Sequence, residues 1–205
     1  MVATGMLNSM MEPALALMDF SSIAVGIEAA DAMIKRAEID DIRAGTVQPG
    51  RYLVLIAGTV AEVQESVSAG REVGGDAVLD YVFLPHVHPD VVQAIGGGRV
   101  PDVTDALGIV ETATVAAAIQ AADSGVKGAD VRLVEVRLAD GLGGKGIVLY
   151  AGLVADVEAA VEIGVDVLDP PSRLVRKVVI PQLHPDMWGN VSDATRFSTR
   201  VLERL

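Results

Sequence analysis

Residues 14–35 read ALALMDFSSIAVGIEAADAMIK, and residues 106–127 read ALGIVETATVAAAIQAADSGVK, so the two stretches are identical at 8 of 22 positions. Two further blocks recur in the same order. LVLIAGTVAEV at 53–63 returns as IVLYAGLVADV at 147–157, and PHVHPD at 85–90 returns as PQLHPD at 181–186. Ordered blocks that recur at a nearly constant offset indicate a duplicated structural unit. The chain of 205 residues therefore contains two homologous units of about 90 residues each.

The repeat also predicts where each part of the chain begins and ends. The parts are an N-terminal extension, a first domain, a linker, a second domain and a C-terminal helix, at residues 1–12, 13–98, 99–105, 106–190 and 191–205. Three glycines at 96–98 precede the linker, and the linker itself contains one Pro and two Asp. The terminal helix is expected because Phe197, Val201 and Leu205 recur every four residues after Ser192, a suitable capping residue.

Each unit begins with a predicted strand and a predicted helix. Ala14–Phe20 is a short apolar run typical of a buried strand. Ile23, Ile27, Ala30 and Ile34 then fall on one face of a helix, which is expected to pack on the core. The corresponding residues of the second unit are Val115, Ile119, Ala122 and Val126.

The rest of the unit is predicted to be a hairpin, a second helix and a last strand. Turn residues between Asp41–Ala44 and Tyr52–Ala57 favour a hairpin. The second helix is expected to end at Gly70, and the last strand to cover Ala77–Leu84. The apolar stripe of that helix is Val60, Val63 and Val67. The order β-α-β-β-α-β predicts an α+β, ferredoxin-like fold with both helices on one face of an antiparallel sheet.

Composition excludes several classes of function. The formal net charge of −12 and the aromatic content of 3% argue against nucleic-acid binding. A chain without cysteine has no disulfide, thiolate nucleophile or sulfur-ligated cluster, and a reducing compartment is expected. The longest apolar runs are far shorter than the roughly 20 residues that span a bilayer, and no signal peptide is apparent, so no membrane association is expected.

Two motifs suggest chemistry but favour structural interpretations. Gly141, Gly143 and Gly146 spell G-x-G-x-x-G, yet a strand follows them where a dinucleotide site needs a helix, so a glycine-rich hairpin tip is favoured. His88 and His184 occupy equivalent positions before Pro-Asp, but a metal needs three or four ligands, which favours core or interface histidines. No nucleophile or acid–base pair of a known enzyme class is present, and neither a cofactor nor a metal is expected.

Another repeated motif is Ala-Ala-Asp, followed four residues later by lysine. Asp31–Lys35 and Asp123–Lys127 have the i,i+4 spacing of a favourable surface ion pair on a helix. The small alanines beside them also suit an interface, because they allow a second backbone to approach closely. The residues alone leave both interpretations open.

Three of the repeated motifs resemble the shell proteins of bacterial microcompartments. They are ALGIVE at 106–111, IEAADAMIK at 27–35 and IPQLHP at 180–185. The duplication is similar to the tandem-domain class of these proteins, whose chains form pseudohexameric trimers. The resemblance implies a structural shell protein in the cytoplasm, and not an enzyme. It also implies a homotrimer that joins hexameric tiles and pentameric vertices edge to edge, with a central pore for small metabolites.

The resemblance also assigns roles to residues. The hairpin tips would surround the pore, with the loops formed by Gly45, Thr46, Val47, Gln48, Pro49, Gly50 and Arg51, and by Asp140, Gly141, Leu142, Gly143, Gly144 and Lys145. Glycine-rich backbone with Arg51 and Lys145 would attract small anions there. The tile edge would include Lys35, Lys127, Asp31, Asp123, His86 and Gln182. His86 and Gln182 stand where the family often has an edge-locking arginine, so the edge contacts are expected to differ.

An alternative from a different class is a tandem ferredoxin-like regulator that binds a small effector between its units. Both kinds of protein would be oligomeric. A shell tile would assemble into sheets or closed shells with partner tiles, whereas a regulator would remain a discrete oligomer that its ligand stabilises.

Overall fold

The computed structural model describes residues 13–97 and 106–192 and divides the chain into two compact units, one ending at Pro89 and one beginning at Asp90. The predicted N-terminal extension and linker lie outside the described residues. So do residues 193–205, which hold nearly all of the predicted C-terminal helix. Each unit is described by itself below.

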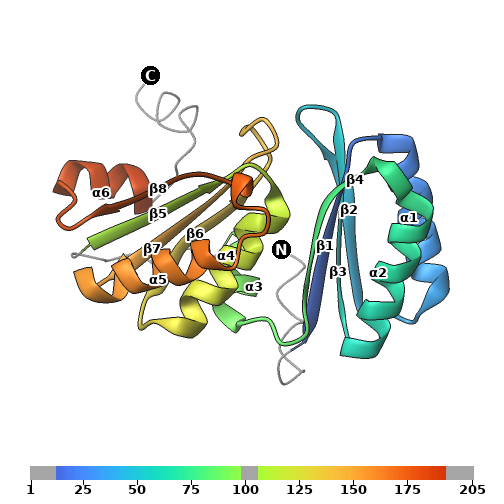
Figure 1. The fold of residues 1–205 in the computed structure, drawn as a ribbon, viewed down its shortest axis with the longest axis horizontal. Helices are drawn as coiled ribbons and strands as arrows, with labels where there is room; N and C mark the ends of the chain where they lie inside the picture. The colour runs from blue at the N-terminus through green and yellow to red at the C-terminus, as the bar shows by residue number, and fades with distance from the viewer. Residues whose placement is uncertain (1–12, 98–105, 193–205) are drawn as a thin grey trace. The chain divides into compact units, whose positions relative to one another are not determined.

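The two units contain the same succession of strands and helices (Figure 1). The first comprises β1 (Ala14–Phe20), α1 (Ile23–Arg36), β2 (Asp41–Val47), β3 (Arg51–Gly58), α2 (Val60–Gly74) and β4 (Val78–Leu84). A short helix α3 (Pro89–Ile95) follows. The second comprises β5 (Ala106–Thr112), α4 (Val115–Gly128), β6 (Arg132–Leu138), β7 (Gly146–Gly152), α5 (Val154–Asp166), β8 (Leu174–Ile180) and α6 (Pro185–Ser192).

Each unit forms one antiparallel four-stranded sheet. The strand order is β2-β3-β1-β4 in the first and β6-β7-β5-β8 in the second. The first strand of each unit is therefore paired on both sides. The two long helices of each unit cover the same face of the sheet (Figure 1). The predicted ferredoxin-like β-α-β-β-α-β fold is confirmed.

Local sequence signals explain where the helices begin. The hydroxyl of Ser22 accepts a hydrogen bond from the Val25 amide at the start of α1, and Thr114 does the same for α4. Thr59 and Glu62 form a reciprocal capping box at the start of α2. Such caps satisfy amides that have no partner within the helix, and each typically contributes about 1 kcal/mol.

The predicted apolar stripe of the first helix is wrong in unit 1 for its three isoleucines, whereas Ala30 is buried as predicted. Gly26, Ala29, Ala30 and Met33 are the buried residues of α1, whereas the isoleucines of the predicted stripe are substantially exposed. The reason is steric, because an ideal Cβ on Gly26 would lie 2.7 Å from the Tyr52 ring. At Gly26 the helix approaches the sheet with no side chain between them. In unit 2 the predicted stripe of α4 is buried as expected.

The prediction that Gly70 ends the second helix is also wrong. The helix α2 continues to Gly74, and Gly75, with φ +47°, follows it. Gly70 lies inside the helix. Glycine is needed there because an ideal Cβ would come within 2.7 Å of the sulfur atoms of Met18 and Met33. A glycine can thus mark a close approach as well as a helix end. Of the predicted stripe, Val63 and Val67 are buried and Val60 is half-exposed.

The last strand of each unit carries a β-bulge. Asp19 pairs with Asp80 and Phe20 pairs with Val78, which leaves Leu79 as an extra residue. In unit 2 the same register shift leaves Val175 unpaired between the partners of Glu111 and Thr112. Both bulged residues are 43% exposed.

The duplicated cores are filled by compensating changes in side-chain volume. Unit 1 has Ile56 on β3 and Met33 on α1, and the equivalent residues in unit 2 are Tyr150 and Gly125. An ideal Cβ on Gly125 would lie 2.5 Å from the Tyr150 hydroxyl oxygen. The Tyr150 ring therefore fits only because residue 125 has no side chain. The buried hydroxyl donates a hydrogen bond of 2.6 Å to the carbonyl of Ala121. Burial raises the pKa of Tyr150, which therefore stays protonated and able to donate.

Replacing Gly125 by Met should destabilise the protein by roughly 1–3 kcal/mol or more, because the new side chain overlaps the Tyr150 ring. The double variant Gly125→Met/Tyr150→Ile reproduces the combination found in unit 1 and should recover part of the loss. Guanidinium unfolding of wild type, both single variants and the double variant measures the coupling free energy. Additive effects of the two substitutions would contradict the compensation.

Candidate functional site

The hairpin tip of unit 1 is shorter than predicted. β2 extends to Val47 and β3 begins at Arg51, so Gln48, Pro49 and Gly50 alone form the turn. Gly45, Thr46 and Val47, predicted as loop residues, belong to the strand because they pair in register with β3. The amide of Gly50 donates to the Val47 carbonyl over 3.0 Å, and the positive φ of Gly50, +83°, suits glycine.

The hairpin tip of unit 2 is the predicted loop over 140–145. It lies between β6 and β7, so the G-x-G-x-x-G motif is a hairpin turn, as the sequence favoured. Gly141, Gly143 and Gly144 all have positive φ angles, which explains the glycine content. The amide of Ala139 donates to the Lys145 carbonyl over 2.9 Å and closes the turn.

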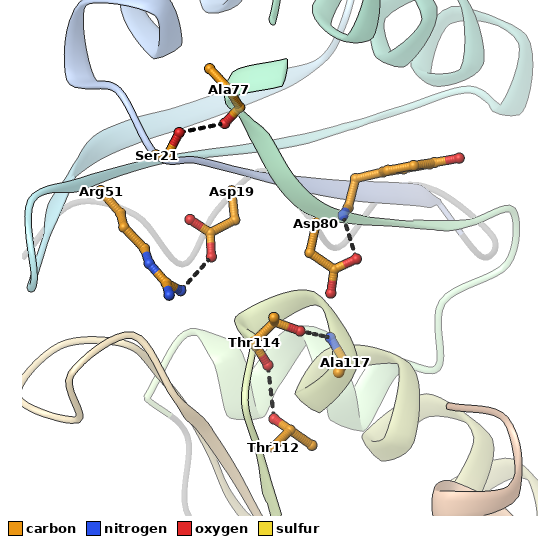
Figure 2. A network of polar contacts seen from close by, with 9 residues as sticks. Asp19, Ser21, Arg51, Ala77, Asp80, Thr112, Thr114 and Ala117 are labelled. Atoms are coloured by element: carbon orange, nitrogen blue, oxygen red, sulfur yellow. Dashed lines mark hydrogen bonds and ion pairs between the residues drawn. The ribbon is translucent and has the colours of Figure 1, made fainter. Parts of the chain in front are cut away.

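A basic residue at the base of each tip forms an ion pair with the first strand. The Arg51 Nη1 lies 3.1 Å from Asp19 Oδ2, and the Lys145 Nζ lies 2.7 Å from Glu111 Oε1. Figure 2 shows the Arg51 side chain extended toward the Asp19 carboxylate. Asp19 and Glu111 are equivalent in the repeat, as are Arg51 and Lys145. Neither acidic residue was identified from the sequence.

The two ion pairs differ in environment. The Asp19 side chain is fully buried, whereas that of Glu111 is 33% exposed. Burial raises the pKa of Asp19 from 3.8 to about 6, the Arg51 charge opposes this rise, and the Asp80 charge adds to it. Asp80 lies directly opposite Asp19 on β4, where unit 2 has Arg176 opposite Glu111. Within the described part of the chain, nothing donates a hydrogen bond to Asp19 Oδ1.

The predicted ion pairs of the Ala-Ala-Asp motifs are confirmed. Lys35 Nζ lies 2.5 Å from Asp31, and Lys127 Nζ lies 2.6 Å from Asp123. The first pair is largely exposed, with Lys35 74% accessible. In the second pair the Asp123 side chain is only 5% exposed. The two lysines therefore present different surroundings to any neighbouring molecule.

The closing motif of each unit leads into a short helix. His86 and Gln182 are exposed residues in the turns after β4 and β8. α3 and α6 each begin at the proline that follows a histidine. His184 is exposed, and its Nδ1 accepts a hydrogen bond from the Asp186 amide over 3.3 Å. Among residues 13–97 and 106–192, no three His, Asp or Glu side chains are arranged to hold a metal ion.

A patch on α1 was missed by sequence reasoning. Ile23, Ile27 and Ile34 are 38%, 53% and 47% exposed. The equivalent residues of α4 are all buried. We call these three isoleucines the α1 patch. The sequence shows a hydrophobic stripe here, but periodicity alone assigns such a stripe to the core of the unit.

Comparisons with known proteins support the resemblance. The BMC domain model matches residues 14–87 and 106–183. The bacterial microcompartment shell protein PduT of Citrobacter freundii is 40% identical over 178 residues, which covers 87% of this chain and 97% of the relative. These comparisons do not support the regulator alternative.

Solved structures agree. A microcompartment protein from Desulfitobacterium hafniense has a TM-score of 0.76 at 46% identity, over 86% of this chain and 98% of that one. The fused permuted hexameric shell protein MSM0275 of the RMM microcompartment has a TM-score of 0.55 at 21% identity, over 78% and 83%, and shows the shared fold. None of the helices that the structure describes is long and apolar enough to cross a membrane. The chain belongs to the BMC domain family, whose members are structural proteins of the microcompartment shell and not enzymes.

Proposed function

We propose that three copies of this chain form a pseudohexagonal tile of a bacterial microcompartment shell. Each chain supplies two similar units, so three chains give six units about one axis, a closed arrangement with head-to-tail contacts. The observation that carries this proposal is the α1 patch. An apolar helix face that is buried in one unit and exposed in its duplicate is expected where a second copy completes the contact.

The position of the patch supports an interface between copies. Ile23, Ile27 and Ile34 are spaced by four and seven residues, so they form a continuous stripe on α1. Burying them contributes favourable free energy at roughly 25 cal/mol for each Å² of apolar surface removed from water. The three residues would form the apolar centre of the contact.

The hairpin tips are proposed to surround a central pore for small metabolites. Each tip is short and closed by its own hydrogen bonds, which suits a constriction of defined width. Six such tips would meet at the axis, three of the type ending at Arg51 and three of the type ending at Lys145. The backbone amides of the glycine-rich tips would favour small anions.

The tile edge is proposed to include Lys35 and Lys127 with Asp31 and Asp123, and the turn residues His86 and Gln182. In this arrangement the tile would join hexameric tiles and, in a closed shell in the cytoplasm, pentameric vertices. The Lys35 pair is exposed and the Lys127 pair is half-buried, so alternate edges of the tile would differ in how accessible their charged groups are.

Replacing Ile27 by Asp should convert the trimer to monomers, because a carboxylate cannot be buried at an apolar contact without a partner. The side chain is half-exposed within one chain, so the fold itself should persist. Sedimentation velocity measures the assembly, and circular dichroism measures the fold. Ile27→Leu is the matched control and should remain trimeric. A trimer that survives the Asp substitution would refute this interface.

Replacing Lys35 and Lys127 by Gln should leave the trimer intact but abolish extended sheets of tiles, which electron microscopy detects. Glutamine avoids a second carboxylate beside the buried Asp123. Lys177→Gln removes a charge from another surface ion pair, with Glu162, and should not affect sheets. Sheets formed equally well by the double variant would make these lysines ordinary solvated residues.

A further inference from the structure

The hairpin tips have less free positive charge than their sequences suggest. Arg51 and Lys145 were expected to offer two cations per chain to anions, but each is bonded to a carboxylate of the first strand, over 3.1 and 2.7 Å. The arrangement occurs in both units with different residue types, Asp with Arg and Glu with Lys. It is therefore a feature of the strand positions, since the acid is the second-to-last residue of β1 or β5, while the base begins β3 or directly precedes β7.

We propose that Asp19 and Glu111 are positioning residues that hold Arg51 and Lys145 against the first strand and so limit the attraction of the hairpin tips for anions. The inference rests on the proposed function, because the tips affect transport only where they surround a pore. A cation bonded to a carboxylate attracts a second anion weakly, since the two opposite charges largely cancel at a distance.

The two units should differ in how firmly the base is held. Asp19 is buried and faces Arg51 on β3 and Asp80 on β4, and a second carboxylate opposite it makes its ionised form costly. Glu111 is partly exposed and faces two bases, Lys145 and, across the β5–β8 pairing, Arg176. The Asp19–Arg51 pair is thus the weaker restraint under acidic conditions, and the pKa of Asp19, raised to about 6 by burial, lies where mild acidification protonates it.

Sulfate is a suitable probe because it stays fully ionised between pH 5 and 7.5. Titration of the full-length protein, followed through the backbone amide signals of Gly50 and Gly143, reports on the two tips separately. In wild type, sulfate affinity at Gly50 should rise as the pH falls, with a midpoint near 6. Affinity at Gly143 should change less. A Gly50 profile no steeper than that of Gly143 would overturn the difference between units.

The variant Asp19→Asn should strengthen sulfate binding at Gly50 by roughly ten- to thirtyfold at pH 7.5, because it removes one negative charge about 4–6 Å from a divalent anion in water. It should also remove the rise in sulfate affinity at Gly50 as the pH falls. Glu111→Gln should act in the same way at Gly143 alone. In Asp19→Asn/Asp80→Asn, Arg51 has neither of these carboxylates as a partner, so binding at Gly50 should be at least as strong.

The matched control is Asp41→Asn, which removes a carboxylate paired with Arg43 at the far end of the same hairpin. It should leave both tips unchanged. Equal gains from Asp41→Asn and Asp19→Asn would overturn the positioning role in favour of a net-charge effect, as would an Asp19→Asn variant that binds like wild type. Sedimentation of the same samples tests the trimer separately. A monomer would refute the pore, while the sulfate profiles would still decide the role of Asp19.

Discussion

The first strand of each unit is hydrogen-bonded to neighbours on both sides, and this central position governs the rest of the fold. β1 pairs with β3 and β4, and all seven of its residues are buried. Its alternate residues contribute to the helix-covered core, and the opposite set includes Asp19. The Asp19 carboxylate has no access to water, so its environment is set by what the adjoining strands place beside it. The hairpin supplies Arg51 and the last strand supplies Asp80. The packing of the sheet therefore sets the charge near the hairpin tip.

The two halves of the chain keep one backbone plan with different side-chain solutions. Gly26 accommodates Tyr52 in unit 1, whereas Ala118 lies against Gly146 in unit 2, so the larger residue has moved from one element to the other. The buried carbonyls between the helices are also satisfied differently. Ser66 donates to Met33 in one unit and Tyr150 donates to Ala121 in the other. Close packing of this kind tolerates exchange of volume between neighbours far better than a change in total volume.

Much of the fold followed from the sequence because its signals are local or repeated. The Ala14–Phe20 strand has the predicted bounds, and the repeat identified the two units without reference to coordinates. The α1 patch could not be predicted, because hydrophobic periodicity shows that a face is apolar but not whether its partner lies in the same chain. The role of Gly70 is ambiguous in the sequence because a helix end and a close approach both favour glycine. The Asp19–Arg51 pair joins residues 32 positions apart, and only the strand register brings them together.

The bulges at Leu79 and Val175 have a bearing on how a shell protein avoids uncontrolled growth. β4 and β8 are outer strands, and an unbroken outer strand is a template onto which another chain can zip its backbone. An extra residue interrupts the even spacing of donors and acceptors along that border and increases its twist. In the proposed tile, edge-to-edge assembly through side chains would thereby be kept apart from fibril formation through main chains.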